Sequence, residues 1–158
     1  MRPFHGQRHL KPAIQIVPFR PRHLPRVLRI ERASFGRDAW PIGEFLDYYR
    51  ECGAWFVVAK LSGRIAGYGI TCLEQRGAEI ASIAVHPDYR RRGVAAALMH
   101  HMLDAVASAG LRRVELMVRC DNPAGQQLYR SLGFRRVRRV RGYYDDGTEG
   151  ILMAKSLR

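Results

Sequence analysis

The sequence predicts a single α/β domain in which a mixed sheet of six to seven strands has helices on both faces. Its 158 residues, of which 47% are hydrophobic, are enough to bury one core without disulfides or metals. Strand-like and helical segments succeed one another along the chain, and neither an internal repeat nor an interdomain linker separates them. We expect the domain to cover residues 14–158, and residues 1–13, which are polar and basic, to form a flexible extension.

The first half is predicted to run in the order strand 14–19, helices 21–35 and 41–51, and strands 55–61, 64–72 and 79–85. Pro21 suits the first position of a helix, and apolar residues recur at helical spacing from there to Phe35. Ser62-Gly63 is a tight-turn signal between two segments rich in β-branched and aromatic residues. The run from Ile80 to Val85 is nearly apolar, as expected of a strand covered on both faces.

The second half is predicted to continue with a helix from Val94, a strand over 113–118, a helix from Asn122, and strands over 134–140 and 149–157. Apolar residues recur at helical spacing after Val94 until Gly110 ends that helix. Asn122 is a good helix cap because Pro123 follows at the first helical position. Gly133 marks the end of this last helix.

The chain is strongly basic, with 27 Lys and Arg against 14 Asp and Glu and a net charge of +13. A basic surface attracts polyanions such as nucleotide phosphates, RNA or acidic proteins. Arginines occur at 90–92, 112–113 and 135–141, so the charge belongs to the folded body and not to one tail. The apolar runs are too short and too often interrupted by charges to span a bilayer, and the N-terminus does not resemble a secretion signal.

Cysteine usage points to an intracellular compartment. Cys52, Cys72 and Cys120 are odd in number and widely spaced, with neither metal-ligand spacing nor a disulfide framework. This pattern suits a reducing cytoplasm, and we expect a cytoplasmic protein. His86, His100 and His101 are too scattered to indicate a metal site, so no metal is expected.

The segment after the strand at 79–85 has the features of a pyrophosphate-binding turn. The first turn of a helix offers free backbone N–H groups and the positive end of the helix dipole. Gly93 permits a close approach of the backbone, Ala95 and Ala96 keep side chains out of the way, and Arg90 to Arg92 add positive charge. Neither a Walker A loop nor the three-glycine dinucleotide pattern is present. A basic helix start without any ligand is the alternative.

Two motifs resemble those of the GNAT acetyltransferases. In the first, Arg or Gln is followed after two residues by Gly and after one more by Gly or Ala, a pattern that Arg90, Gly93 and Ala95 fill. The second is the run Leu128-Tyr129-Arg130-Ser131-Leu132-Gly133-Phe134, with Asn122 a few residues before it. The resemblance covers nearly all of residues 14–157 and implies acetyl-coenzyme A (acetyl-CoA) as the cofactor. It also implies a mostly antiparallel sheet that splays between its fourth and fifth strands.

In this family the splay leaves backbone groups free to pair with the pantetheine arm, and the matching positions here are Ile83 and Val85. The pyrophosphate is expected on the amides that follow Arg90. Asn122 is expected to contact the cofactor, or to act as a helix cap and nothing more. The cofactor-binding residues that the resemblance implies are Ile83, Ala84, Val85, Arg90, Arg91, Arg92, Gly93, Val94, Ala95, Ala96, Asn122 and Tyr129.

Acetyl transfer from a thioester to an amine needs a base for the amine, donors for the developing oxyanion and an acid for the leaving thiolate. The resemblance implies Tyr129 as the acid and the amide of Ile83 or Val85 as the oxyanion donor. In the RimI-type branch, which acetylates protein N-termini, a Glu stands where this chain has Met117, and methionine cannot take a proton. Glu79 and Glu115 are the carboxylates that could replace it, with Glu79 favoured, and a water chain is the alternative.

The C-terminal region resembles the acceptor groove of N-terminal acetyltransferases. Tyr143 and Tyr144 match the paired tyrosines that line this groove, although half-buried strand positions are their ordinary interpretation. Phe35 and Trp40 fall where the opposite wall is expected. Gly150 departs from the pattern, which has Asp or Ala there. The expected acceptor is the N-terminal α-amine of a protein, with a ribosomal protein beginning in Ala or Ser as the best candidate.

Two alternatives stay open. The first is an acetyltransferase for a small amine such as a polyamine, an aminoglycoside or an amino acid. Its acceptor could be attracted by an acidic patch formed by Glu44, Asp47, Asp145, Asp146 and Glu149. The second is a non-catalytic, CoA- or RNA-associated binding module, which the arginines and Met117 would suit. Ribosome association through the basic surface, no membrane partner, and a monomer or weak homodimer are also expected.

Overall fold

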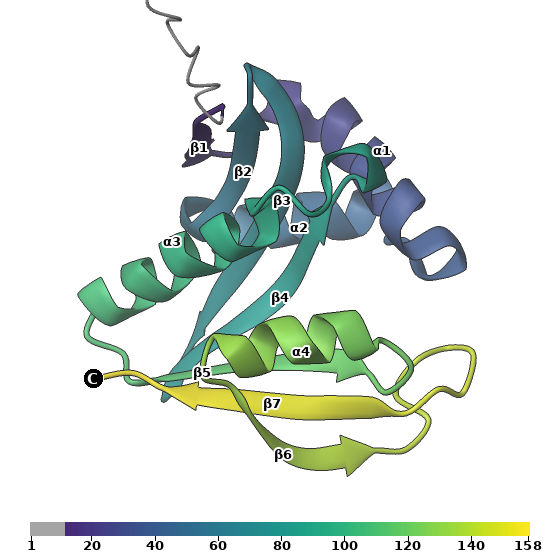
Figure 1. Ribbon diagram of the computed structural model, residues 1–158, viewed down its shortest axis with the longest axis vertical. Helices are drawn as coiled ribbons and strands as arrows, with labels where there is room; N and C mark the ends of the chain where they lie inside the picture. Colours follow the sequence, from purple (N-terminus) through teal and green to yellow (C-terminus); the bar gives the residue numbers. More distant parts are fainter. Residues whose placement is uncertain (1–11) are drawn as a thin grey trace, which may run out of the picture.

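The computed structural model describes residues 12–158, which form a seven-stranded sheet in the order β1-β2-β3-β4-β5-β7-β6 (Figure 1). The strands are β1 (Ile14–Pro18), β2 (Phe56–Leu61), β3 (Arg64–Glu74), β4 (Gly77–Val85), β5 (Arg113–Arg119), β6 (Arg135–Val140) and β7 (Gly150–Ser156). β4 and β5 are parallel, and the other neighbouring strands are antiparallel. The extension predicted over residues 1–13 lies, apart from its last two residues, outside the described residues.

Helices cover both faces of this sheet, as predicted. They are α1 (Leu24–Phe35), α2 (Ile42–Cys52), α3 (Val94–Ser108) and α4 (Pro123–Ser131). α1 and α2 pack on one face, around a buried cluster that includes Phe45, Phe56 and Tyr68. α3 and α4 lie on the opposite face, where Leu98 and Met102 of α3 enter a second cluster (Figure 1). The expected α/β fold is therefore confirmed.

Helix α3 lies close to β3 because two strand positions are glycine. A β-carbon added at Gly67 would come 2.7 Å from the carbonyl oxygen of Ala84 and 3.2 Å from a methyl group of Leu98. One added at Gly69 would come 2.6 Å from the sulfur of Met102. Real side chains would push α3 outward. The two glycines thus allow α3 to pack closely against β3.

The parallel strands β4 and β5 stay paired over only a short distance. Their pairs run from Ala78 with Val114 to Ile80 with Leu116. Directly afterwards β4 contains a bulge, because the residues opposite Ile70 and Thr71 of β3 are Ser82 and Ile80. A bulge bends its strand and increases the local twist, so the two strands diverge (Figure 1). The predicted splay between the fourth and fifth strands is confirmed.

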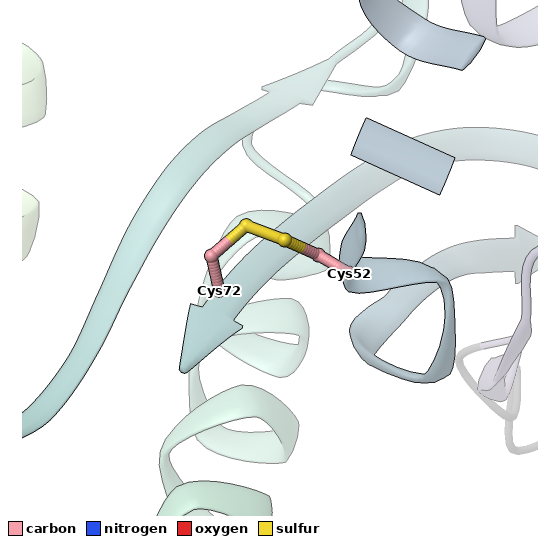
Figure 2. Close-up of a disulfide and its surroundings, with 2 residues drawn as sticks. All are labelled: Cys52 and Cys72. Carbon is pink, nitrogen blue, oxygen red and sulfur yellow. A yellow bond between two sulfur atoms is a disulfide. The ribbon is translucent and has the colours of Figure 1, made fainter. Parts of the chain in front are cut away.

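The expectation that the cysteines form no disulfide is wrong. Cys52 at the end of α2 and Cys72 in β3 are joined by a disulfide, with their α-carbons 5.3 Å apart (Figure 2). Within the described residues Cys120 is free and exposed. The pair is separated by 20 residues in sequence and meets because α2 packs across β3. The cysteine pattern therefore no longer supports a reducing compartment.

Candidate active site

A cavity of about 450 Å³ lies where β4 and β5 separate. Its floor is formed by the strand segments 80–83 and 116–119. One wall comes from α1, α2 and the loop between them, and contains Glu31, Phe35, Asp38, Trp40 and Glu44. The opposite wall comes from the loop between β6 and β7 and contains Tyr143, Tyr144 and Asp145. Glu79, Asn122 and Tyr129 complete the lining, so all four predicted groove residues face one space.

A second cavity of about 220 Å³ lies at the start of α3. Its lining residues are Val85, Tyr89, Arg90, Arg91, Gly93, Val94, Ala95, Ala96 and Leu128. Gly93 has a φ of +80°, a left-handed conformation that lets the chain turn sharply into the helix. Nothing lies within 4 Å of the position that its side chain would take, so the helix start is open. Free amides, arginines and open space at one helix start fit a pyrophosphate.

The backbone at the end of β4 faces the gap between the strands. The amide of His86 donates to the carbonyl oxygen of Ala66 in the β3 strand at 2.8 Å. Amide groups alternate in direction along a strand, so those of Ile83 and Val85 point away from β3. Both residues also lie beyond the last pair that β4 forms with β5. These positions fit an extended pantetheine chain, as the resemblance implies.

Two predicted cofactor residues are not placed in either cavity. The side chain of Ala84 is buried in the cluster beneath α1 and α2, on the other face of the sheet. The guanidinium carbon of Arg92 lies over the ring of Tyr89, 5.7 Å from its centre. Neither residue lines a cavity, whereas the other ten residues predicted to bind the cofactor line one of the two.

The structure separates the two candidate bases. Glu79 is half-buried in the larger cavity, and burial, followed by the nearby Glu74 and Glu115, raises the pKa of its carboxyl group. Burial, followed by the Glu79 charge, also raises the pKa of the Tyr143 phenol, and the two side chains line the same cavity. Glu115 is the partner of Glu79 across the strand pair but does not line the cavity. Its carboxylate accepts a 2.9 Å hydrogen bond from Arg113.

Tyr129 is directed into the larger cavity from α4. The helix begins where predicted, because the side-chain oxygen of Asn122 accepts a 3.0 Å hydrogen bond from the amide of Gly125. The Tyr129 ring packs edge-on against Phe134, with 6.1 Å between ring centres. Burial raises the pKa of its phenol to about 12. The phenol is therefore protonated at neutral pH, as a general acid must be.

A buried carboxylate that the sequence did not single out borders the same cavity. Glu31 of α1 is only 1% exposed. It accepts a 2.9 Å hydrogen bond from the amide of Trp40 and another from the hydroxyl of Tyr68, which lies 3.0 Å from the hydroxyl of Ser82. Burial raises the pKa of Glu31. Its place four residues after the buried Val27 was the signal that could have found it.

The two departures from the family pattern, Met117 and Gly150, are in contact. A β-carbon added at Gly150 would come 2.8 Å from the sulfur of Met117 and 3.1 Å from the β-carbon of Tyr143. Glycine at position 150 therefore makes room for the methionine and for the backbone of the groove wall. The floor of the cavity is apolar where a carboxylate was expected.

The opening in the sheet and the glycine-containing helix start together offer one site that fits an extended, phosphate-bearing cofactor. The family model described as Acetyltransferase (GNAT) family matches residues 24–134, and the chain belongs to this family. It is an acetyl-CoA-dependent N-acetyltransferase, and bound acetyl-CoA supplies the acetyl group as a reactive thioester. The residues described here form no cluster of three metal-ligating side chains, and none of their helices is long and apolar enough to cross a membrane.

Similar proteins and a similar solved structure support this membership. An N-alpha-acetyltransferase of Sulfurisphaera tokodaii is 32% identical over 145 residues, which cover 84% of this chain and 86% of the relative. The [ribosomal protein bS18]-alanine N-acetyltransferase of Escherichia coli K12 is 40% identical over 96 residues, which cover 59% of this chain and 65% of the relative. The crystal structure of Ard1 from Thermoplasma volcanium matches 92% of this chain and 99% of its own, with 28% identity and a TM-score of 0.88.

Proposed function

We propose that this enzyme acetylates the N-terminal α-amine of a protein. The observation that carries the proposal is the convergence of aromatic residues from two distant loops on one cavity, which also holds Tyr129 and Glu79. Trp40 is fixed in its wall by its stack on Tyr48, with 4.7 Å between ring centres. Tyr143 is 48% exposed and so is available to an acceptor. The names of the N-alpha-acetyltransferase and the bS18-alanine N-acetyltransferase relatives favour the same acceptor.

Within this proposal Glu79 removes the proton from the amine, directly or through water. It is the carboxylate that faces the groove beside Tyr143, and its raised pKa makes it a better proton acceptor than an ordinary glutamate. The amide of Val85 or Ile83 donates to the developing oxyanion, and the Tyr129 phenol protonates the leaving thiolate. Met117 takes no part in proton transfer.

The lining of the cavity is acidic although the protein as a whole is strongly basic. Five carboxylates border the cavity, those of Glu31, Asp38, Glu44, Glu79 and Asp145. Arg119 also lines the cavity and is paired with Asp38, so carboxylates still outnumber the positive charges of the lining. Such a cavity attracts a protonated amine and offsets the repulsion from a protein with a net charge of +13. The same charges would also attract a small polyamine, so this second acceptor class is tested alongside the first.

The deciding experiment measures acetyl transfer to peptides that begin with Ala, Ser, Thr or Met, with polyamines and peptides carrying only lysine ε-amines in parallel. We expect turnover on free α-amines, with a preference for Ala or Ser. Turnover on small amines alone would overturn the N-terminal assignment. Glu79→Gln should lower turnover and flatten its rise with pH, while Glu115→Gln is the matched carboxylate control.

We further propose that the arginines of β6 bind ribosomal RNA and bring the enzyme to its acceptor in the cytoplasm. β6 is the last strand of the sheet, and every residue from Arg135 to Arg139 is exposed. Arg139 is paired with Glu149, whereas the remaining arginines of the strand form no ion pair within residues 12–158. An edge with free guanidinium groups on both faces suits a phosphate backbone.

The test is co-sedimentation with ribosomes over a range of salt concentrations. Changing Arg135, Arg136 and Arg138 to Glu should weaken binding and reduce its salt dependence. The control variant carries the same charge change at three exposed arginines elsewhere, namely Arg29, Arg32 and Arg64. Equal losses in both variants would show that net charge alone matters and would overturn a specific role for β6.

A further inference from the structure

Arg119, the last residue of β5, joins parts of the chain that are far apart in sequence. Its Nη1 atom donates to Oδ2 of Asp38 at 2.5 Å, and Asp38 belongs to the loop between α1 and α2. Its Nη2 atom donates to Oδ2 of Asp146 at 2.5 Å and to the hydroxyl of Thr148 at 2.9 Å, both in the loop between β6 and β7. Its Nε atom donates to Asp121, just before α4, at 3.0 Å.

The same guanidinium group supports the aromatic wall of the groove. Its central carbon lies over the ring of Tyr144, 4.7 Å from the ring centre. Arg119, Asp38 and Tyr144 all line the larger cavity. The Arg119 side chain is only 21% exposed, and its partners Asp38, Asp146 and Asp121 are 31%, 50% and 59% exposed, so the contact with Asp38 is the best shielded from water. Its hydrogen bonds lower the pKa of Asp146 to about 2, so this contact is ionised at every pH at which the enzyme would be assayed.

The loop on the β6–β7 side is itself arranged around these contacts. The second carboxylate oxygen of Asp146 accepts a 2.9 Å hydrogen bond from the amide of Thr148. The amide of Tyr144 donates to the carbonyl oxygen of Thr148 at 3.2 Å, which closes the turn. Because Arg119 binds the side chains of Asp146 and Thr148, it also fixes the backbone of Tyr144. The opposite loop is held at two points, Asp38 by Arg119 and the amide of Trp40 by Glu31.

We propose that Arg119 is a positioning residue that sets the width of the acceptor groove by holding both of its walls to the end of β5. This inference rests on the acceptor groove proposed above. Arg119 neither gives nor takes a proton in the reaction. One planar guanidinium group can satisfy three carboxylates and a ring face at once, which the single ammonium group of lysine cannot do. An isolated surface ion pair would contribute little, but here the group links three loops.

The first test measures steady-state kinetics of Arg119→Met with an N-terminal peptide and with acetyl-CoA varied separately. We expect the peptide KM to rise about 10- to 100-fold, because small displacements of positioning groups have effects of this size. The affinity for acetyl-CoA should stay near that of the wild type, because Arg119 does not line the cavity at Gly93 and three of its side-chain hydrogen bonds go to the walls of the acceptor groove. The peptide KM of Arg119→Lys should lie between those of the wild type and of Arg119→Met. Arg50→Met is the matched control, because Arg50 is an exposed arginine whose ion pair, with Asp47, lies within α2.

Further measurements separate positioning from a general loss of structure. Asp146→Asn should raise the peptide KM in the wild-type background and have no added effect in Arg119→Met, because the contact is already lost. An unchanged peptide KM in Arg119→Met, or an equal fall in peptide and acetyl-CoA affinity, would overturn the proposal.

Amide hydrogen exchange gives a readout that does not depend on activity. Residues 36–41 and 142–149 should exchange faster in Arg119→Met and not in Arg50→Met, whether or not peptides are the true acceptors. Failure of the wild type to acetylate any peptide would overturn the proposed function, while unchanged exchange in these two loops would overturn the role of Arg119.

Discussion

Replacing Gly150 with alanine tests whether Met117 and the groove wall are packed against each other as described. The new β-carbon would lie 2.8 Å from the Met117 sulfur and 3.1 Å from the Tyr143 β-carbon. Heavy atoms in contact prefer about 3.5–4.0 Å, so one neighbour must move by roughly 1 Å and the other by roughly 0.5 Å. Overpacking of this kind costs about 1–3 kcal/mol in unfolding free energy. For a chain of this length Tm falls by roughly 2–4 °C per kcal/mol.

The assay is urea denaturation of four proteins, namely the wild type, Gly150→Ala, Met117→Ala and the double variant. Met117→Ala removes the sulfur that the new methyl group would meet, so Gly150→Ala should cost less in that background. The difference between the two costs is expected to be about 1 kcal/mol, within the range measured for residues in contact. The peptide KM should rise as well, because the backbone of Tyr143 is displaced.

Equal costs of Gly150→Ala in the two backgrounds would refute this reasoning. They would mean that Met117 does not occupy the space beside Gly150. A rise in the peptide KM without any loss of stability would likewise show that the groove wall yields freely, and that glycine is not required at position 150 for packing.

Three further predictions concern the site. Tyr129→Phe should lower kcat about 10²- to 10⁴-fold, the range for loss of a general acid, with coenzyme A affinity retained by calorimetry; unchanged kcat would remove Tyr129 from the mechanism. Gly93→Asp should abolish coenzyme A binding through charge at the helix start, whereas Gly93→Asn, which also tolerates the φ of +80°, should retain much of it, and equal losses would argue against the charge explanation. Glu31→Gln should change how stability depends on pH. Because burial raises the folded-state pKa of Glu31 above its ordinary 4.5, the wild type should lose unfolding free energy as pH rises from about 4.5 through the raised value. Urea midpoints of Glu31→Gln should not show this loss, and parallel curves for the two proteins would contradict it.

The fold and the cofactor turn could be predicted because their signals are local. The turn at Gly93, the cap at Asn122 and the helix ends at Gly110 and Gly133 each depend on a few adjacent residues, and the structure has all of them in place. The groove residues Trp40 and Tyr143 could be placed only through the family resemblance. The structure brings them to one cavity, while their contact with an acceptor stays a prediction.

The features that could not be predicted depend on packing between distant segments. Cys52 and Cys72 are paired because α2 crosses β3, which no spacing rule reveals. From the sequence alone, Arg119 is an ordinary polar residue at the end of a strand. Its role depends on Asp38, Asp121 and Asp146, which three different loops bring to it. Ala84 lies in the same run as Ile83 and Val85, yet alternation along the strand turns its side chain to the opposite face.

The gap between β4 and β5 also affects the stability of the folded protein. It divides the sheet into a half made of β1 to β4 and a half made of β5 to β7, joined along the strands by three residue pairs (Figure 1). The extended pantetheine arm of a cofactor bound in this gap would act as an eighth strand that contacts both halves of the sheet. A ligand that binds only the folded state stabilises it by mass action, by about 2.7 kcal/mol at a hundredfold excess over Kd. The supply of acetyl-CoA would then govern not only the rate of the reaction but also how much of the protein survives thermal unfolding and proteolysis.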